Sequence, residues 1–79
     1  MKVKLSDVKA VYISSEYIKL DSLLKYSSIV MSGGEAKTLI RSGKVCIDNE
    51  ICTTRGKKIR HGDVVHCENN VLIVKQAVI

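Results

Sequence analysis

Proline, phenylalanine and tryptophan are absent from this 79-residue chain, and aromatic residues make up only 4% of it. The hydrophobic residues nevertheless reach 46%. A core built from this chain must therefore be aliphatic, and the apolar content favours an ordered globular domain over a disordered tail. At this length we expect one small domain over residues 1–79, near the size at which domains begin to need help from metals, disulfides or partners.

Long apolar runs are also missing. No run approaches the roughly 18 residues that a membrane-spanning helix requires. Residues 1–7 (MKVKLSD) lack the continuous apolar centre of a signal peptide. We therefore expect a soluble, cytoplasmic protein that does not act on a membrane.

The cysteines form neither an even set nor a C-x-x-C pair; they are Cys46, Cys52 and Cys67. Three reduced thiols are the simplest interpretation. A zinc site is an alternative, because Cys46 and Cys52 lie symmetrically about Asn49 and would face each other if a hairpin turned there. The closely spaced ligand pairs typical of structural zinc are missing, so we expect no metal and no other cofactor.

Two short helices are predicted in the first half of the chain. Ser32 and Glu35 form a capping box, in which the Ser32 hydroxyl accepts from the Glu35 amide and the Glu35 carboxylate reaches back to the Ser32 amide. This helix should end near Gly43, a residue able to take positive φ. Its apolar stripe is Ala36, Leu39 and Ile40. An earlier amphipathic helix is predicted from about Lys19 to Ser27, with its stripe at Leu20, Leu23 and Leu24.

The predicted strands flank these helices, and most of them follow. A short β-like run covers residues 9–13, and residues 45–47 and 51–54 should form a hairpin around a turn near Asp48, Asn49 and Glu50. Turns at Gly62-Asp63 and Asn69-Asn70 separate two further strands, residues 64–67 and 71–74. We expect an α+β fold, with two short helices packed on a small antiparallel sheet that contains β-hairpins.

Positive charge points to a polyanionic partner. Thirteen Lys and Arg against eight Asp and Glu give a formal net charge of +5, which favours nucleic acid first and an anionic membrane second. The densest feature is the loop predicted over residues 55–61, in which Gly56 would allow close approach of a phosphate backbone. Its cations are Arg55, Lys57, Lys58 and Arg60.

Other features of the chain leave alternatives open. Lys37 and Arg41 lie four residues apart on one face of the second helix, and they either contact phosphates or form an ordinary solvated face. Gly33 and Gly34 leave that helix N-terminus open to a phosphate, or they serve only as a structural turn. The loop has no aromatic residue, which favours recognition of RNA by shape and backbone. Tyr17 and Tyr26 could stack a splayed base, but a tyrosine on a short helix more often packs at the edge of a core.

Several motifs resemble the S4 RNA-binding domain, above all its small stand-alone bacterial members. The similarity covers about residues 18–65 as a core motif and reaches nearly end to end. It lies in Lys19-Leu20-Asp21, Leu24, Ser32, Ala36, Leu39-Ile40, Gly43, Val45, Ile47, Asn49 and Gly62-Asp63, with Gly33-Gly34-Glu35-Ala36-Lys37 and Thr54-Arg55-Gly56-Lys57-Lys58-Ile59 typical of the stand-alone proteins. The resemblance implies the αL architecture, in which two helices and a β-hairpin form a concave basic face that grips structured RNA.

The chain also departs from the S4 pattern at the start of each helix. Many S4 domains have Ser-Arg where this chain has Ser32-Gly33, and Arg is commoner where this chain has Lys19. A lysine is a point charge and lacks the planar fork with which an arginine holds a phosphate.

From these features we expect a non-catalytic, monomeric RNA-binding protein that acts in ribosome assembly or translation. Ribosomal RNA is favoured over transfer RNA, with the ribosomal subunit as a candidate partner. The predicted RNA contacts are Lys19, Lys37, Arg41, Arg55, Lys57, Lys58 and Arg60. No nucleophile motif, Walker loop or metal signature indicates an enzyme. The alternative is an adaptor whose basic face docks an acidic protein. A β-grasp carrier is set aside because residues 76–79 (QAVI) are not a Gly-Gly tail.

Overall fold

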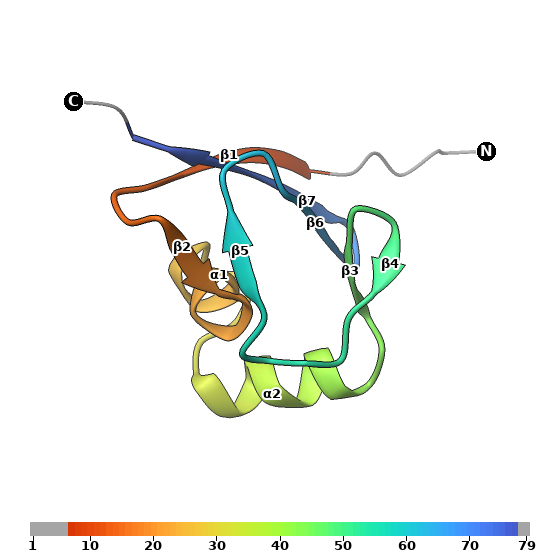
Figure 1. The fold of residues 1–79 in the computed structure, drawn as a ribbon. Helices are drawn as coiled ribbons and strands as arrows, with labels where there is room; N and C mark the ends of the chain where they lie inside the picture. The colour runs from red at the N-terminus through yellow and green to blue at the C-terminus, as the bar shows by residue number, and fades with distance from the viewer. Residues whose placement is uncertain (1–6, 78–79) are drawn as a thin grey trace.

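The structure, a computed structural model, describes residues 7–77. Figure 1 shows two helices below a twisted sheet. The elements are β1 (Asp7–Ile13), β2 (Tyr17–Lys19), α1 (Leu20–Tyr26), α2 (Gly33–Arg41), β3 (Val45–Ile47), β4 (Glu50–Ile51), β5 (Lys58–Arg60), β6 (Val64–Cys67) and β7 (Asn70–Gln76). The α+β fold is confirmed, with both helices close to their predicted positions.

The strands form two sheets. The larger has the order β1-β7-β6-β3-β4, and the smaller pairs β2 with β5. The prediction of a purely antiparallel sheet is wrong at one position, because β1 pairs with β7 in parallel, from Asp7 opposite Asn70 to Ile13 opposite Gln76. Almost the whole chain lies between these two strands, so the connection is long enough to return in the same direction. The remaining pairs are antiparallel.

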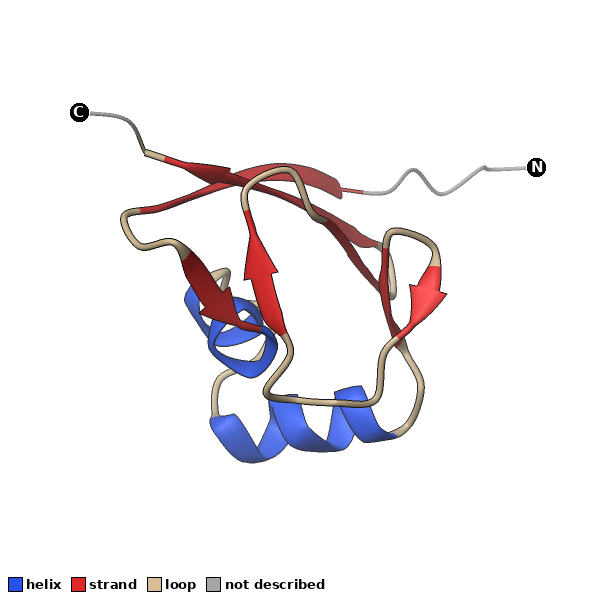
Figure 2. Ribbon diagram, in the orientation of Figure 1, coloured by secondary structure: helices blue, strands red, loops and turns tan. Residues whose placement is uncertain are grey.

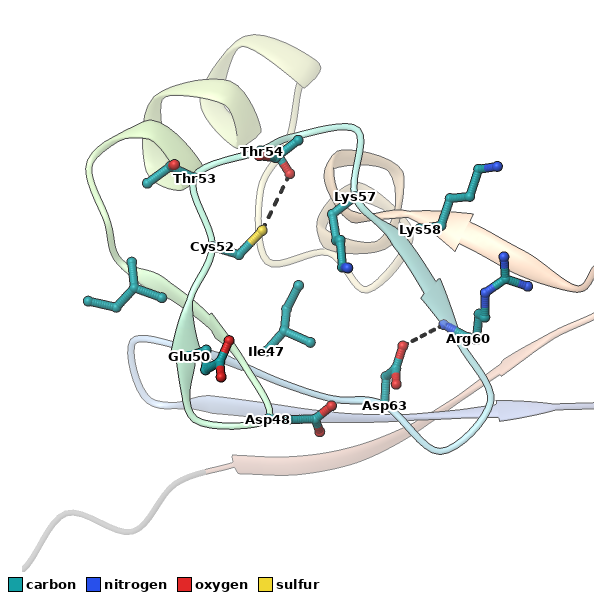
Figure 3. Close-up of a pocket in the computed structure, with 11 residues that line it drawn as sticks. Ile47, Asp48, Glu50, Cys52, Thr53, Thr54, Lys57, Lys58, Arg60 and Asp63 are labelled. Carbon is teal, nitrogen blue, oxygen red and sulfur yellow. Dashed lines mark hydrogen bonds between the residues drawn. The ribbon is translucent and has the colours of Figure 1, made fainter.

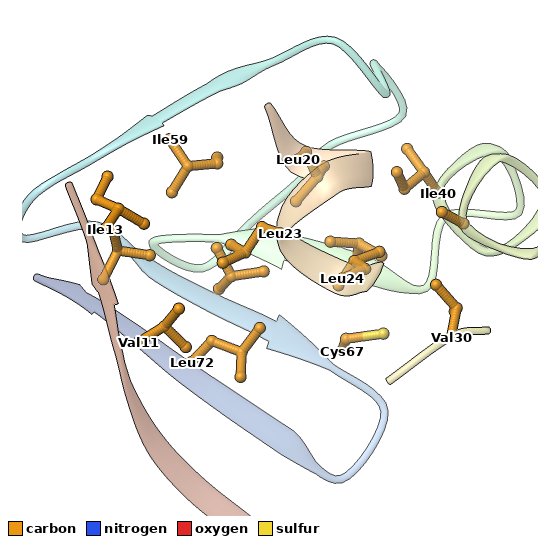
Figure 4. Packing of buried hydrophobic residues seen from close by; sticks show 14 residues of the cluster. Val11, Ile13, Leu20, Leu23, Leu24, Val30, Ile40, Ile59, Cys67 and Leu72 are labelled. Atoms are coloured by element: carbon orange, nitrogen blue, oxygen red, sulfur yellow. The ribbon is translucent and has the colours of Figure 1, made fainter. Parts of the chain in front are cut away.

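The core lies between the larger sheet and the helices (Figure 2). Leu20, Leu23 and Leu24 of α1 are fully buried, and they meet buried side chains from both the sheet and α2, as Figure 4 shows. The other buried members are Val11, Ile13, Val30, Ala36, Ile40, Val45, Ile59, Val65, Cys67, Leu72 and Val74. The core is therefore aliphatic, as the scarcity of aromatic residues requires.

The start of α2 follows the capping prediction in part. The Ser32 hydroxyl accepts from the Glu35 amide at 3.2 Å, as predicted. The Glu35 carboxylate instead accepts from the Met31 amide at 3.1 Å, one residue further back than the capping box predicts. Both contacts satisfy main-chain donors near the first turn, where a helix has no internal partners for them.

The β3–β4 hairpin was predicted to turn symmetrically about Asn49, but its centre lies between Asp48 and Asn49. Asp48 and Asn49 both have positive φ, 50° and 73°, and make the two-residue turn that suits the twist of paired strands. Cys46 then lies opposite Ile51. Cys52 is displaced past the pairing, and its amide donates to the carbonyl of Val45 at 2.9 Å. The two cysteines are therefore not cross-strand neighbours.

Replacing a glycine that has positive φ should destabilise the fold more than replacing a glycine that does not. Gly43 and Gly62 have φ of +79° and +93°, whereas a Cβ on Gly33 would meet nothing within 4 Å. We expect Gly62→Ala to lower the free energy of unfolding by about 1–2 kcal/mol, because the left-handed region is costly for alanine. Gly33→Ala is the matched control and should leave stability equal or slightly higher. Urea denaturation of both variants tests this, and equal losses would contradict it.

Cys67 should be the least reactive thiol of the folded protein. Its side chain is fully buried, and burial, followed by the charge of Glu68, raises its pKa to about 11 from an ordinary value of 9.0. A raised pKa means that stability should fall as pH rises from about 9 towards 11, since only the unfolded chain releases the proton easily. Iodoacetamide labelling at pH 8, read by mass spectrometry, should modify Cys67 after Cys46 and Cys52. Labelling at the rate seen in urea would contradict this.

Candidate nucleic-acid interface

A two-stranded ribbon, β2 with β5, displays three of the seven predicted cations. Its register places Tyr17 opposite Arg60 and Lys19 opposite Lys58. Between these pairs, Ile18 lies opposite the fully buried Ile59 and packs against the core. Because side chains alternate along a strand, the flanking residues point to the opposite side. We call this surface the ribbon face; it consists of Tyr17, Lys19, Lys58 and Arg60.

Charge is concentrated on the ribbon face. The Lys58 ammonium lies 4.8 Å from the centroid of the Tyr17 ring, and the Arg60 guanidinium carbon lies 5.7 Å from it. Lys19 faces Lys58 directly, and like charges in that relation destabilise a strand pair. Neither strand contains an acidic residue. The face thus carries three exposed cations, two of them over one aromatic ring, an arrangement suited to an anion.

The segment before β5 is fixed by main-chain hydrogen bonds. The carbonyls of Arg55 and Lys57 accept from the amides of Asp21 and Leu20 at 3.1 and 2.9 Å. The N-cap residue Lys19 makes no side-chain hydrogen bond, so these carbonyls accept from the first two amides of α1. The Lys57 amide in turn donates to Thr54 at 3.2 Å, which closes a tight turn. The side chains of Arg55 and Lys57 stay exposed on a backbone that the helix holds in place.

A groove of about 640 Å³ separates β5 from the β3–β4 hairpin. Lys57, Lys58 and Arg60 all line it, and Lys57 extends furthest inward (Figure 3). Its lining also includes three carboxylates, those of Asp48, Glu50 and Asp63. The Asp63 carboxylate accepts from the Arg60 amide at 2.8 Å, and that of Asp48 accepts from the Val64 amide at 3.2 Å. The groove therefore has mixed charge and suits a phosphate backbone less than the ribbon face does.

The predicted basic loop over residues 55–61 is correct as a cluster of cations but wrong as a loop. Residues 58–60 form β5, and turns flank it on both sides. Strands are predicted from alternating apolar and polar residues over about 4–8 positions, and a three-residue strand with one apolar residue is too short to show that alternation. The structure gathers five predicted residues around β5: Lys19, Arg55, Lys57, Lys58 and Arg60.

Lys37 and Arg41 lie apart from that cluster, on α2. Arg41 is exposed and Lys37 half-buried, and neither joins the ribbon pairing or lines the groove. They form a second basic surface.

Sequence reasoning missed the place of Tyr17 beside the loop cations. The loop itself contains no aromatic residue, but the ribbon pairing brings one onto its face. A signal was present, because residues 17–19 (YIK) and 58–60 (KIR) share the order polar, isoleucine, polar. Two such triplets indicate two short strands that each bury one isoleucine.

The described part of the chain holds neither a cluster of metal ligands nor a membrane-spanning helix. Across residues 7–77, no three His, Cys, Asp or Glu side chains lie together as a metal site requires. Within the same range, neither helix has the length and apolar character needed to span a bilayer.

Removing the like-charge contact should stabilise the fold. We expect Lys19→Gln to raise the free energy of unfolding by about 0.2–1 kcal/mol at low salt, because it relieves the repulsion from Lys58. Lys75→Gln is the matched control, since it removes the same charge from β7, where Lys75 faces Tyr12. Urea denaturation at low and at molar salt measures both, and the gain should shrink as salt screens the charges. A gain of equal size in the control would assign the effect to net charge alone.

Comparison with known proteins identifies the family. The model of the S4 domain family matches residues 11–75. A 56-residue stretch is 38% identical to the probable ribosome maturation protein RlbA of Bacillus subtilis (strain 168) and covers 71% of this chain and 79% of that protein. A crystal structure of a pseudouridylate synthase shares the fold, with a TM-score of 0.64, at 23% identity over 71% of this chain; the chain spans only 24% of that enzyme. The chain therefore belongs to the S4 domain family.

Proposed function

We propose that this protein binds structured RNA, ribosomal RNA in particular, and that it does so without catalysing a reaction. The ribbon face is the principal contact, and the exposed side chains of Arg55 and Lys57 extend it along the neighbouring turn. The observation that carries this proposal is the acid-free strand pair with three exposed cations, two of which lie over one ring. Phosphate contacts of this kind supply most of the affinity of proteins for nucleic acids.

The relatives support a ribosomal role. A maturation protein of ribosomes is 38% identical to this chain over most of its own length, which favours ribosome assembly or translation as the setting. The pseudouridylate synthase shares the fold, and the chain corresponds to only 24% of that enzyme. We infer that this chain corresponds to a part that holds RNA, with the chemistry of such enzymes located elsewhere in them.

The α2 surface is proposed as a second, weaker contact. Lys37 and Arg41 add two charges there. They have no ring beside them and no opposing strand to fix them, so each should contribute less than a cation of the ribbon face. We propose that the protein acts as a monomer in the cytoplasm.

Exchanging matched sets of cations tests the proposal. The triple variant Lys19→Gln, Lys58→Gln, Arg60→Gln should bind a structured ribosomal RNA fragment at least 10-fold more weakly than the wild type. Its slope of log affinity against log salt should be shallower by about 2–3, because each phosphate that a protein neutralises adds roughly 0.7–0.9 to that slope. The control triple Lys9→Gln, Lys44→Gln, Lys75→Gln removes the same charge from exposed positions elsewhere and should keep most of the affinity and slope.

Fluorescence anisotropy across a salt series, with a duplex DNA of equal length as competitor, measures these quantities. Equal losses in the two triples would mean that net charge, and not the ribbon face, drives binding. If the wild type binds weakly and without preference for RNA over DNA, the RNA-binding proposal is overturned, and an acidic protein becomes the partner to seek.

A further inference from the structure

Tyr17 differs from the other two tyrosines in its surroundings. Tyr12 and Tyr26 are 59% and 65% exposed and lie on β1 and at the end of α1. The ring of Tyr17 is partly exposed and lies on the ribbon face, with two cations over it. Nothing in the core requires an aromatic ring at this position, since the residue that the ribbon buries is Ile59.

The two cations over this ring can leave it. Lys58 and Arg60 are exposed, and cation–π contacts of exposed groups are worth only about 0.5–1 kcal/mol. A phosphate would attract the Lys58 ammonium and the Arg60 guanidinium more strongly than the ring does, because both groups form charge-assisted hydrogen bonds with phosphate oxygens. Binding of an RNA backbone would therefore uncover the face of the Tyr17 ring.

An uncovered aromatic ring between phosphate contacts is a place for a nucleobase. Stacking of a base on an aromatic side chain is worth about 1–3 kcal/mol and tolerates any base. Lys19 follows on the same strand about 7 Å further along, at a rise of about 3.4 Å per residue, and faces Lys58 on β5. Only an unpaired base has a free face to offer, because paired bases in an RNA helix are stacked on one another.

We propose that the ribbon face binds one unpaired nucleotide of the RNA, with its base stacked on Tyr17 and its flanking phosphates held by Lys19, Lys58 and Arg60. This inference rests on the proposed RNA binding and adds to it the structural class of the RNA. The preferred ligand is a helix interrupted by a bulge or joined to a single-stranded end. A fully paired helix of the same length binds through phosphates alone.

Two RNA hairpins closed by the same loop test the proposal, one with a fully paired stem (the paired hairpin) and one with a single bulged adenosine in that stem (the bulged hairpin). The wild type should prefer the bulged hairpin by about 5-fold or more, the equivalent of a stack of about 1 kcal/mol. Tyr17→Leu should abolish that preference without weakening binding to the paired hairpin, because the contacts that it removes are absent from the complex. Tyr17→Phe keeps the ring and should keep the preference. Tyr12→Leu, which removes a ring outside the ribbon face, is the matched control and should match the wild type.

A spectroscopic readout reports the stack directly. The chain has three tyrosines and no tryptophan, so the double variant Tyr12→Phe, Tyr26→Phe leaves Tyr17 as its sole strong fluorophore. Saturation with the bulged hairpin should quench this fluorescence well beyond saturation with the paired hairpin. Circular dichroism of each variant confirms that it is folded.

The alternative role of Tyr17 is to hold Lys58 and Arg60 in position. In that case Tyr17→Leu would weaken both hairpins equally, Tyr17→Phe would restore both, and quenching would be equal for the two. Those results would overturn the stacking site and leave the proposed RNA binding intact. If the wild type binds neither hairpin, both proposals are overturned together.

Discussion

Two main-chain hydrogen bonds join the start of α1 to the basic segment that precedes β5. The amides of Leu20 and Asp21 need acceptors, and the carbonyls of Lys57 and Arg55 supply them. Because donors and acceptors are main-chain atoms, the connection does not depend on which side chains the basic segment carries. The sequence of that segment is thus free to carry charge, while its path is fixed by the helix that it caps.

The ribbon remains paired despite the repulsion on its surface. Burial of an isoleucine is worth about 1.5–3 kcal/mol, and Ile59 is fully buried beneath the pair. A like-charge pair such as Lys19 with Lys58 costs about 0.2–1 kcal/mol. Burial therefore outweighs repulsion, and the cations stay side by side without a neutralising acid. An RNA phosphate placed between them would relieve the repulsion, so the arrangement that weakens the free protein would strengthen the proposed complex.

Local signals were enough to predict much of the fold, and pairing between distant segments explains what was missed. The capping residue Ser32, the leucine stripe of α1 and the terminal Gly43 each act within one turn of helix, so the sequence locates both helices well. The parallel pairing of β1 with β7 and the ribbon itself join segments far apart in the chain. No local pattern encodes those partners. The cations were predicted as a set, but the ring of Tyr17 among them became visible only once β2 was paired with β5.

The acidic side chains of the groove restrict where a phosphate backbone can run. Asp48 and Asp63 accept main-chain hydrogen bonds that shape the turns on either side of the groove, so these carboxylates have a structural reason to be there. Together with Glu50, they balance the charge of the three cations that line the groove, so the groove attracts RNA less than the acid-free ribbon face does. Specificity often depends on such unfavourable contacts as well as on favourable ones. The backbone of a bound RNA should therefore follow the ribbon face, with the groove at its edge, and this path would lead it directly over Tyr17.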